Sequence, residues 1–465
     1  MEFRLLVQVE RTHHDSESVL SLEGRHWLVT EPYDISDWSA IPEYTCVSYV
    51  WGSGRTPHPL HRGFDISVNT LPSLAAAISS QPELGTAFWI DAFCIPTDRQ
   101  KKQATLESMG FIYSRAKQVV VAFSGASYAA IDQITKSDRL DDHHLEVLNR
   151  DEWVKSVWTY QEVVNSQKLV CVCPDLPGSS TIDGSEFLNR VGFSLHLYKN
   201  RHGLGGFDLH DRFPQLSALE DLVADYMVAG YLERSALQVM SAMDLRVHRK
   251  PTHRLYAMIG AVTQKPSRSS TTATLAELAE LFMAACEEKN DYSFIYSTAP
   301  RDMRPDKRWR PVPGCLPSIL PWAGFGSGQR AFRDASSGCL WLEDVVSFQV
   351  QPQSVLTQLA KEIIVGWTGH KELVESDELL AEQLYTTLKR VGFSGSNRYA
   401  VVDDGLFFPL YDVHPVGVVL VATGVRWVFG APGLLLQNTG QGIEYIPGVF
   451  AGSISVKEAG RALLT

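Results

Sequence analysis

The residue with the clearest potential for chemistry is Glu162, a carboxylate within the aromatic and β-branched segment KSVWTYQEVV at 155–164. As a helix, this segment would carry one stripe of side chains, formed by Val154, Val157, Trp158 and Gln161. Glu162 follows Trp158 by one helical turn, so we expect its carboxylate to lie over the indole at the edge of that stripe. The alternative is structural, with Glu162 capping the helix or pairing with Lys155 or Arg150 beside a core tryptophan.

A second candidate is the loop GSGR at 52–55, directly after the apolar run YTCVSYVWG. Gly52 and Gly54 would let backbone N–H groups approach a ligand, and Arg55 adds a guanidinium, so the loop could bind a pyrophosphate. The spacing is not a complete dinucleotide fingerprint, and glycine–serine–glycine loops also occur without a ligand. Phosphate binding and an ordinary turn both remain open.

Asp91 lies in the apolar segment WIDAFCI, which we expect to be a buried strand. A carboxylate there is costly unless it is hydrogen-bonded or used by a ligand, and both uses are consistent with the pattern. Cys94 has no evident partner histidine, so a buried apolar cysteine is the preferred interpretation. The histidine pairs lack an accompanying cysteine or acid at a recognised ligand spacing, so we expect no metal site.

The first half of the chain supplies the elements that must position these residues. Apolar runs of strand length at 44–52, 87–95, 117–125 and 168–173 alternate with helical periodicity, and a further strand is expected near the N-terminus. Unbroken apolar strands separated by helices indicate a parallel sheet that is covered on both faces. Ligands collect beyond the carboxyl ends of such strands, which directs attention to 51–55, 91–98 and 124–128.

The second half has a different pattern. We expect a loop-rich stretch at 174–212, then helices up to about residue 289, and then short strands joined by Gly, Asn and Asp turns, with one helix near 372–390. The domains predicted from this organisation are an α/β domain at 1–175, a helical region at 176–300 and a β-rich module at 301–465 that packs on the rest.

Bulk composition excludes several classes of protein. The chain has 465 residues, is 45% hydrophobic and 20% charged, and carries a formal net charge of −11, so nucleic acid and anionic membranes are not expected partners. Its seven cysteines show no disulfide spacing, and no apolar stretch is long enough to span a bilayer. Without a signal-like N-terminus, the expected location is cytoplasmic.

Several motifs in order resemble the fungal heterokaryon-incompatibility (HET) domain. They are YTCVSYVWG at 44–52, FWIDAFCIPTDRQ at 88–100, MGFIYSRAKQVVVAFSG at 109–125 and SVWTYQE at 156–162. The resemblance covers about residues 1–175, and LRVHRKPTHRLYAMIGAV at 245–262 resembles the segment that follows the domain, with His253 where an aspartate normally stands. IPTDRQKKQ departs from the family pattern, which usually has Asn-Gln after the isoleucine and an acid near Lys101.

HET domains are in turn distantly similar to TIR domains, which implies a TIR- or flavodoxin-like parallel sheet flanked by helices. SYVWG at 48–52 resembles the first-strand motif of TIR domains, and SVWTYQE resembles their Ser-x-Trp-x-x-x-Glu helix. In catalytic TIR domains this glutamate serves in cleaving the nicotinamide–ribose bond of NAD. The resemblance therefore implies a catalytic role for Glu162, with Ser156 and Trp158 as its neighbours, although many TIR domains are scaffolds without catalysis.

One carboxylate can suffice for this cleavage, because nicotinamide is a cationic leaving group that needs no general acid and the ribosyl cation needs a nearby negative charge. We expect the nucleotide to contact Trp51, Gly52, Gly54, Arg55 and Asp91. NAD would be a substrate, with no tightly bound cofactor.

The resemblance leaves three functions open. The first is a self/non-self incompatibility or cell-death effector that binds or hydrolyses NAD. The second is a signalling scaffold that acts by self-association without catalysis. The third is a HET-fold enzyme of small-molecule metabolism, which an enclosed pocket near Trp51, Asp91 and Glu162 would favour.

Overall fold

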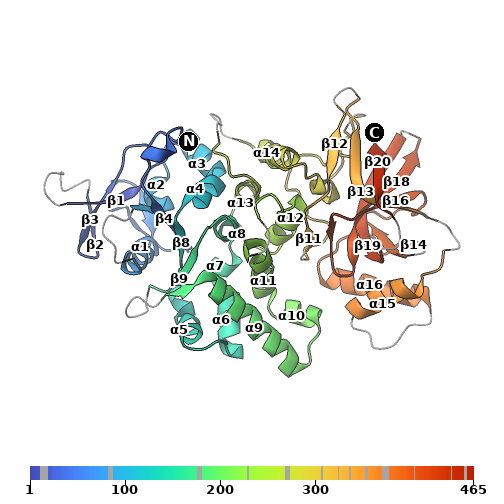
Figure 1. The fold of residues 1–465 in the computed structure, drawn as a ribbon, viewed down its shortest axis with the longest axis horizontal. Coiled ribbons are helices and arrows are strands. Elements are labelled where there is room, and N and C mark those ends of the chain that lie inside the picture. Colours follow the sequence, from blue (N-terminus) through green and yellow to red (C-terminus); the bar gives the residue numbers. More distant parts are fainter. Residues whose placement is uncertain are drawn as a thin grey trace. The chain divides into compact units, whose positions relative to one another are not determined.

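The computed structural model describes residues 1–10, 19–81, 87–174, 181–227, 230–267, 273–304, 307–322, 324–334, 337–350, 354–368, 376–402, 404–440, 442–454 and 458–465 (Figure 1). The chain forms two compact units. The first comprises Met1–Leu204, Arg212–Val228 and Arg246–Ala273, and the second comprises Gly205–Asp211, Ala229–Leu245 and Thr274–Thr465.

The first unit is built on an eight-stranded sheet with the order β10-β9-β8-β4-β7-β1-β3-β2. The strands are β1 (Leu6–Val9), β2 (Leu20–Leu22), β3 (Arg25–Val29), β4 (Tyr44–Ser48), β7 (Ala87–Trp89), β8 (Gln118–Ala122), β9 (Leu169–Val172) and β10 (Ile182–Asp183). The predicted α/β class is confirmed, but the sheet is mixed: β9, β8, β4 and β7 are parallel, whereas the outer strands pair antiparallel. β3 pairs antiparallel with both β1 and β2.

The four parallel strands have the chain order 2-1-3-4, as in flavodoxin-like sheets. From β4 the chain continues to β7 on one side, and from β8 it continues to β9 on the other. The topological switch point, where open α/β sheets hold their ligands, therefore lies beyond Ser48 and Ala122, at the carboxyl ends of β4 and β8.

Three predicted elements of this unit have different boundaries in the structure. The strand predicted at 87–95 ends at Trp89 and is followed by the one-turn helix α2 (Asp91–Cys94), so Asp91 begins a helix and does not lie within a strand. The helical segment expected between the apolar runs at 87–95 and 117–125 is divided at Ser108 into α3 (Arg99–Glu107) and α4 (Met109–Arg115). The helix that carries Glu162 is likewise divided, into α7 (Glu152–Lys155) and α8 (Val157–Val164).

The prediction of a loop-rich stretch at 174–212 was wrong for most of its length. Helix α9 (Gly184–His202) has 19 residues. Its first turn is capped by the Asp183 carboxylate, which accepts hydrogen bonds from the N–H groups of Ser185 and Glu186. It ends at Gly203, whose left-handed φ of 62° is typical of a helix C-terminus.

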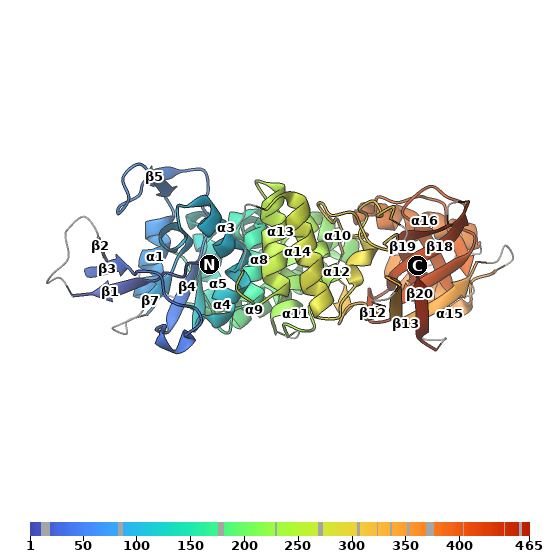
Figure 2. The same ribbon diagram turned by 90° about the horizontal axis from the view of Figure 1, so that it is seen from above.

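Helix α13 (Pro251–Val262) lies side by side with α8 in the views of Figures 1 and 2 and also packs on α4. Glycines make this close approach feasible. A Cβ at Gly110 of α4 would stand 2.0 Å from the Gly260 carbonyl oxygen of α13. On the other side, Nδ2 of Asn165, directly after α8, donates to the same carbonyl oxygen at 2.7 Å. The backbones of these helices therefore fix the position of α13 relative to Glu162.

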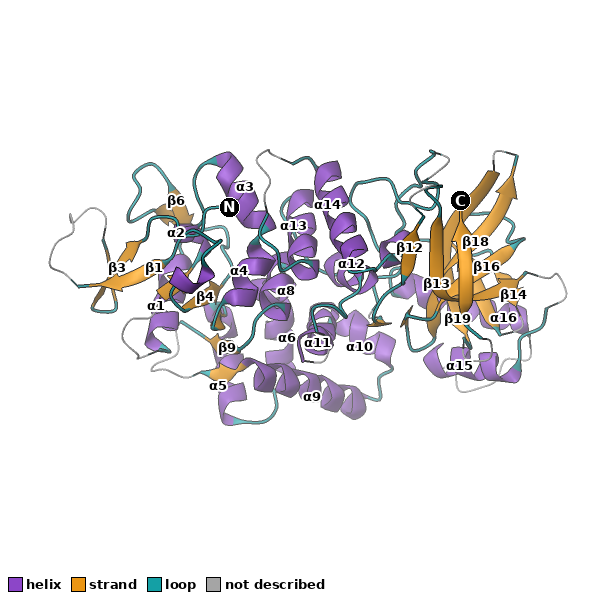
Figure 3. Cartoon of the chain, turned by 45° about the horizontal axis from the view of Figure 1, so that its top comes forward, coloured by secondary structure: helices purple, strands orange, loops and turns teal. Residues whose placement is uncertain are grey.

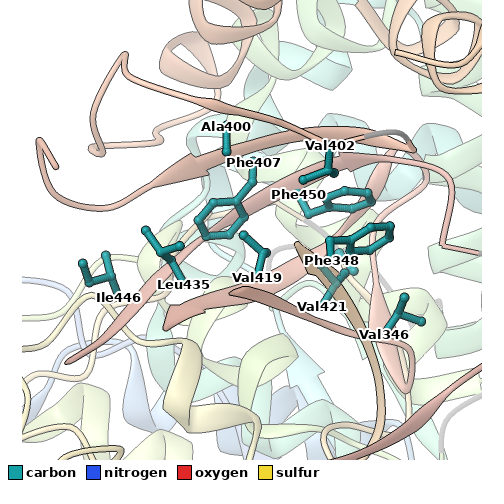
Figure 4. Packing of buried hydrophobic residues seen from close by; sticks show 11 residues of the cluster. Val346, Phe348, Ala400, Val402, Phe407, Val419, Val421, Leu435, Ile446 and Phe450 are labelled. Atoms are coloured by element: carbon teal, nitrogen blue, oxygen red, sulfur yellow. The ribbon is translucent and has the colours of Figure 1, made fainter. Parts of the chain in front are cut away.

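The second unit contains an eight-stranded antiparallel sheet with the order β12-β13-β16-β18-β19-β15-β14, in which β20 also pairs with β13 (Figure 3). The strands are β12 (Ala331–Arg333), β13 (Leu340–Gln349), β14 (Ala400–Val402), β15 (Gly405–Pro409), β16 (Val418–Ala422), β18 (Gly430–Thr439), β19 (Gly442–Gly452) and β20 (Gly460–Leu464). A buried cluster that includes Phe348, Phe407 and Phe450 forms its core (Figure 4). Helices α12 (Ala236–Asp244), α14 (Leu275–Glu288), α15 (Gln358–Thr368) and α16 (Asp377–Arg390) complete the unit.

We predict that Gly110→Ala destabilises the first unit by roughly 3 kcal/mol or more, because the added Cβ meets backbone atoms that cannot rotate away. Gly192→Ala in the interior of α9 is the matched control. Its Cβ would meet only Glu220 Oε1, at 4.0 Å, so removal of a helical glycine should stabilise by up to about 1 kcal/mol. Urea unfolding followed by tryptophan fluorescence measures both changes, and a Gly110→Ala midpoint at or above that of the wild type would contradict this packing.

Candidate functional site

Glu162 lies beneath the carboxyl end of β4, with only 6% of its surface exposed. The hydroxyl of Ser48, the last residue of β4, donates to Oε2, and the Tyr113 hydroxyl donates a second hydrogen bond to the carboxyl group. Ser48 Oγ accepts a hydrogen bond of 2.8 Å from Nε1 of Trp153. The carboxyl group is therefore held directly from β4 and α4, and through Ser48 from α7.

A backbone interaction causes the break between α7 and α8. The Val247 N–H donates to the Lys155 carbonyl at 2.7 Å, and the Val157 N–H donates to the Val247 carbonyl at 3.2 Å. Ser156 lies between these two bonds with extended φ and ψ of −70° and 139°, so the helix cannot continue through it. Its hydroxyl accepts a hydrogen bond from the Trp158 N–H at 3.3 Å and caps α8.

The restart of the helix places Trp158 in a different cluster from the one we expected. Its indole packs against His253 and Tyr256 of α13, at centroid distances of 5.2 and 6.2 Å. Trp158 is half-buried, whereas Trp153 is fully buried and joins the hydrogen-bond network of Glu162. The two tryptophans thus lie on either side of the break at Ser156.

Burial raises the pKa of Glu162 to about 8. The hydrogen bond from Ser48 opposes this rise, the charge of Asp91 adds to it, and the hydrogen bond from Tyr113 opposes it. A carboxyl group with this pKa holds its proton at neutral pH. Glu162 therefore acts as a buried neutral acid unless a ligand or a change of pH removes the proton.

Asp91 is the second carboxyl group of the cluster and is half-buried. Its two oxygens accept hydrogen bonds from the Tyr49 hydroxyl at 2.8 Å and from Nε1 of Trp51 at 2.6 Å. Burial raises the pKa of Asp91, while these hydrogen bonds and the charge of Lys102 act in the opposite direction. The side chain is anchored at both oxygens and is oriented by residues of the β4 segment.

A cavity of about 1000 Å³ opens beside Asp91. Its walls include Trp51, His58, Phe93 and Lys102 as well as Asp91, so it combines aromatic faces with carboxylates and cations. His58 is 8% exposed, and its Nδ1 accepts hydrogen bonds from the backbone N–H groups of Leu60 and His61, both at 3.0 Å. Of the residues predicted to contact a nucleotide, Trp51 and Asp91 lie on this wall.

In the loop at 52–55, which the sequence suggested could bind a pyrophosphate, backbone carbonyl groups accept hydrogen bonds from a side chain of the loop itself. Gly52 has a left-handed φ of 56°. Arg55 Nη1 donates to the carbonyl oxygens of Trp51, Gly52 and Gly54 at 3.4, 3.1 and 2.8 Å. The Arg55 guanidinium also lies over the Trp51 ring, 5.4 Å from its centroid, so it stands next to the cavity wall.

A second cavity, of about 570 Å³, lies at the topological switch point. Val50, Ser124 and Trp153 line it. Part of the segment 124–128, where the sequence led us to expect a ligand, therefore borders a cavity. Asp151 at its wall accepts hydrogen bonds from the hydroxyls of Ser124 and Ser127, at 2.7 and 2.5 Å. It also caps α7 through the Trp153 N–H.

Sequence reasoning missed the hydroxyl groups that hold the two carboxyl groups. Ser48 and Tyr49 are polar residues within the apolar run YTCVSYVWG, and this interruption was the available signal. Tyr113 has a buried ring like a core residue, but its hydroxyl serves Glu162. Cys94 is fully buried as expected, and burial raises its pKa to about 12.

Neither a metal cluster nor a membrane-spanning helix is found in the described part of the chain. No three His, Cys, Asp or Glu side chains there are grouped so that they could hold a metal ion. Each helix among the described residues is too short or too polar to cross a bilayer.

Comparisons with known proteins agree with the motifs that surround this site. No curated protein and no solved structure matched the chain. The matched family is described as "Heterokaryon incompatibility protein (HET)", and the match runs from Tyr44, the first residue of β4, to Glu162 itself. Residues 44–162 of this chain therefore form a HET domain, the domain of heterokaryon-incompatibility proteins.

Proposed function

We propose that the HET domain binds NAD in the cavity lined by Trp51 and Asp91 and hydrolyses its nicotinamide–ribose bond, as the effector step of an incompatibility or cell-death response. The observation that carries this proposal is Asp91, an anchored carboxylate on the wall of a cavity of about 1000 Å³ with an aromatic ring beside it. Such a combination suits a ligand with a flat ring and a ribose.

The reaction requires little from the protein besides electrostatics. The bond between the ribose C1′ and the nicotinamide nitrogen breaks, and its electron pair neutralises the cationic ring. Water then adds to C1′ and loses a proton, which gives nicotinamide and ADP-ribose. A fixed carboxylate beside the ribose stabilises the developing positive charge. Asp91 can supply this charge because its oxygens are oriented by Tyr49 and Trp51.

Glu162 has a different part in this proposal from Asp91. Because its pKa is raised to about 8, it is neutral at the pH at which Asp91 must be charged. Two adjacent carboxyl groups that are both ionised would repel each other, so a protonated Glu162 lets Asp91 keep its negative charge. Glu162 thus acts as a positioning residue for Asp91 and becomes a second anion only when the site loses a proton.

The burial of Glu162 also favours a second candidate, a self-associating scaffold without catalysis. In that case its hydrogen bonds with Ser48 and Tyr113 serve only the fold. This candidate predicts that surface substitutions abolish the biological response while Asp91→Asn leaves it intact.

Purified protein incubated with NAD should release nicotinamide, and Asp91→Asn should lower the rate about 100-fold or more, because the fixed negative charge is removed. Asp65→Asn is the matched control, since Asp65 also lines the cavity but is exposed on the β5–β6 hairpin (Arg55–Pro57 and Asp65–Ser67). The absence of nicotinamide release from the wild type at concentrations that permit self-association would rule out the catalytic proposal. An equal loss of rate in Asp91→Asn and Asp65→Asn would show that Asp91 has no specific part in the cleavage.

Glu162 should also make the stability of the fold depend on pH. The unfolded chain loses this proton near the ordinary value of 4.5, whereas the native state holds it to about 8. The unfolded state therefore binds fewer protons between these values, and stability falls as pH rises through this window, by up to about 5 kcal/mol. Glu162→Gln cannot ionise, so its unfolding midpoint should fall less than that of the wild type between pH 5 and pH 8. Glu43→Gln, at an exposed glutamate, should follow the wild type. Parallel profiles for Glu162→Gln and wild type would show that Glu162 does not hold its proton.

A further inference from the structure

Two guanidinium groups from distant parts of the chain meet at one carbonyl oxygen. Arg55 Nη1 donates to the Gly52 carbonyl at 3.1 Å, and Nη2 of Arg249 donates to the same oxygen. Both side chains are exposed, and both belong to the first unit. Two like charges that share one neutral acceptor repel each other, and an anion between them would relieve this repulsion.

Two lysines act on a neighbouring group together with Arg249. Lys250 and Lys102, the latter on α3, influence the His253 ring, as do His248 and Arg249. Burial, and then the charges of neighbouring groups with Lys250 foremost, lower the pKa of His253 to about 4, so the imidazole is neutral and lies within a positive field. The cluster, defined here as the cationic rim, comprises Arg55, Lys102, Arg249 and Lys250.

The arginines and lysines of the cationic rim have no carboxylate partner within 4 Å among the residues that the structure describes. Glu152 is the acid near Gly52: its Oε2 lies 3.8 Å from where a Cβ of Gly52 would stand, yet it forms no ion pair with Arg55 or Arg249 within the described chain. Unpaired cations gathered in a protein with a formal net charge of −11 indicate a place for an external anion.

The N-terminus of α13 adds to this positive field. The helix starts at Pro251, no side chain caps the backbone at Lys250, and the first turn carries no acid. The dipole of α13 therefore adds to the attraction for an anion near the side chains of this segment.

We propose that the cationic rim is the subsite for the diphosphate of a dinucleotide whose ribose lies at Asp91. The rim is continuous with the cavity through two residues: Lys102 lines the cavity, and Arg55 lies over the Trp51 ring that forms part of its wall. Guanidinium groups bind phosphate oxygens through paired hydrogen bonds, and lysines add point charges. This inference rests on the proposed function for the identity of the ligand and on the cationic rim for the diphosphate itself.

Isothermal titration of the full chain with inorganic pyrophosphate tests the subsite without requiring cleavage. The wild type should bind pyrophosphate with an affinity that falls as salt is added. Arg249→Gln and Lys250→Gln should each weaken this affinity about tenfold or more, since each removes a charge-assisted contact. Lys136→Gln, on α5 (Tyr128–Lys136) and paired with Asp132, is the matched control and should leave the affinity unchanged.

A second titration, with nicotinamide riboside, separates this inference from the proposed function. The riboside lacks the diphosphate, so its affinity should not change in Arg249→Gln or Lys250→Gln. Wild type that does not bind pyrophosphate, unchanged pyrophosphate affinity in both variants, or equal weakening of both probes would each overturn the subsite. Pyrophosphate binding that depends on Arg249 and Lys250 in a protein that releases no nicotinamide would keep the subsite and refute the hydrolysis.

Discussion

The burial of an ionisable carboxyl group beneath the end of β4 is the constraint on which the rest of the site depends. Removing a charged carboxylate from water costs several kcal/mol unless it is paired, and the hydrogen-bond partners of Glu162 are neutral hydroxyl groups. The fold meets this cost by keeping Glu162 protonated and by directing the Ser48 and Tyr113 hydroxyls at it. β4, α4 and α8 must keep their relative positions for that arrangement to persist.

The segment that leads into α13 keeps these elements in place and also brings the cations. The backbone of Val247 bonds on both sides of Ser156, and the Arg246 guanidinium donates to the carbonyls of Val154 and Ser156 at 3.3 and 3.1 Å. These bonds interrupt the helix just before Glu162 and fix the residues that follow Val247 beside Gly52. One short segment therefore defines where α8 begins and where the cationic rim lies.

The sequence predicted the elements of the first unit better than their ends. Apolar runs identified β4, β7, β8 and β9, because strands buried on both faces leave a clear pattern. The break at Ser156 could not be predicted, since its cause is a backbone pairing with Val247, about ninety residues away in the chain. Asp91 was assigned to a strand because WIDAFCI is apolar throughout, and only the fold shows that the chain turns into α2 after Trp89.

The candidate site was predictable to the extent that local motifs carry it. Glu162, Asp91 and Trp51 are each found near the carboxyl end of the sheet, where parallel topology places ligands. The partners that tune these residues come from separate motifs. Tyr113 and Arg249 lie on elements whose positions depend on helix packing at Gly110 and Gly260, and no spacing in the sequence reveals that packing.

The distribution of charge around the cavity determines the orientation in which the proposed ligand would bind. NAD carries a positive nicotinamide ring at one end and two negative phosphates in the middle. In the proposed complex Asp91 faces the cationic end, while the cationic rim faces the diphosphate. A single sign of charge along the whole cavity would hold one of these parts and repel the other. The protonated Glu162 adds no further negative charge near Asp91 before the bond is cleaved. The separation of negative charge at Asp91 from positive charge at the cationic rim therefore depends on the same buried carboxyl group as the packing of the site.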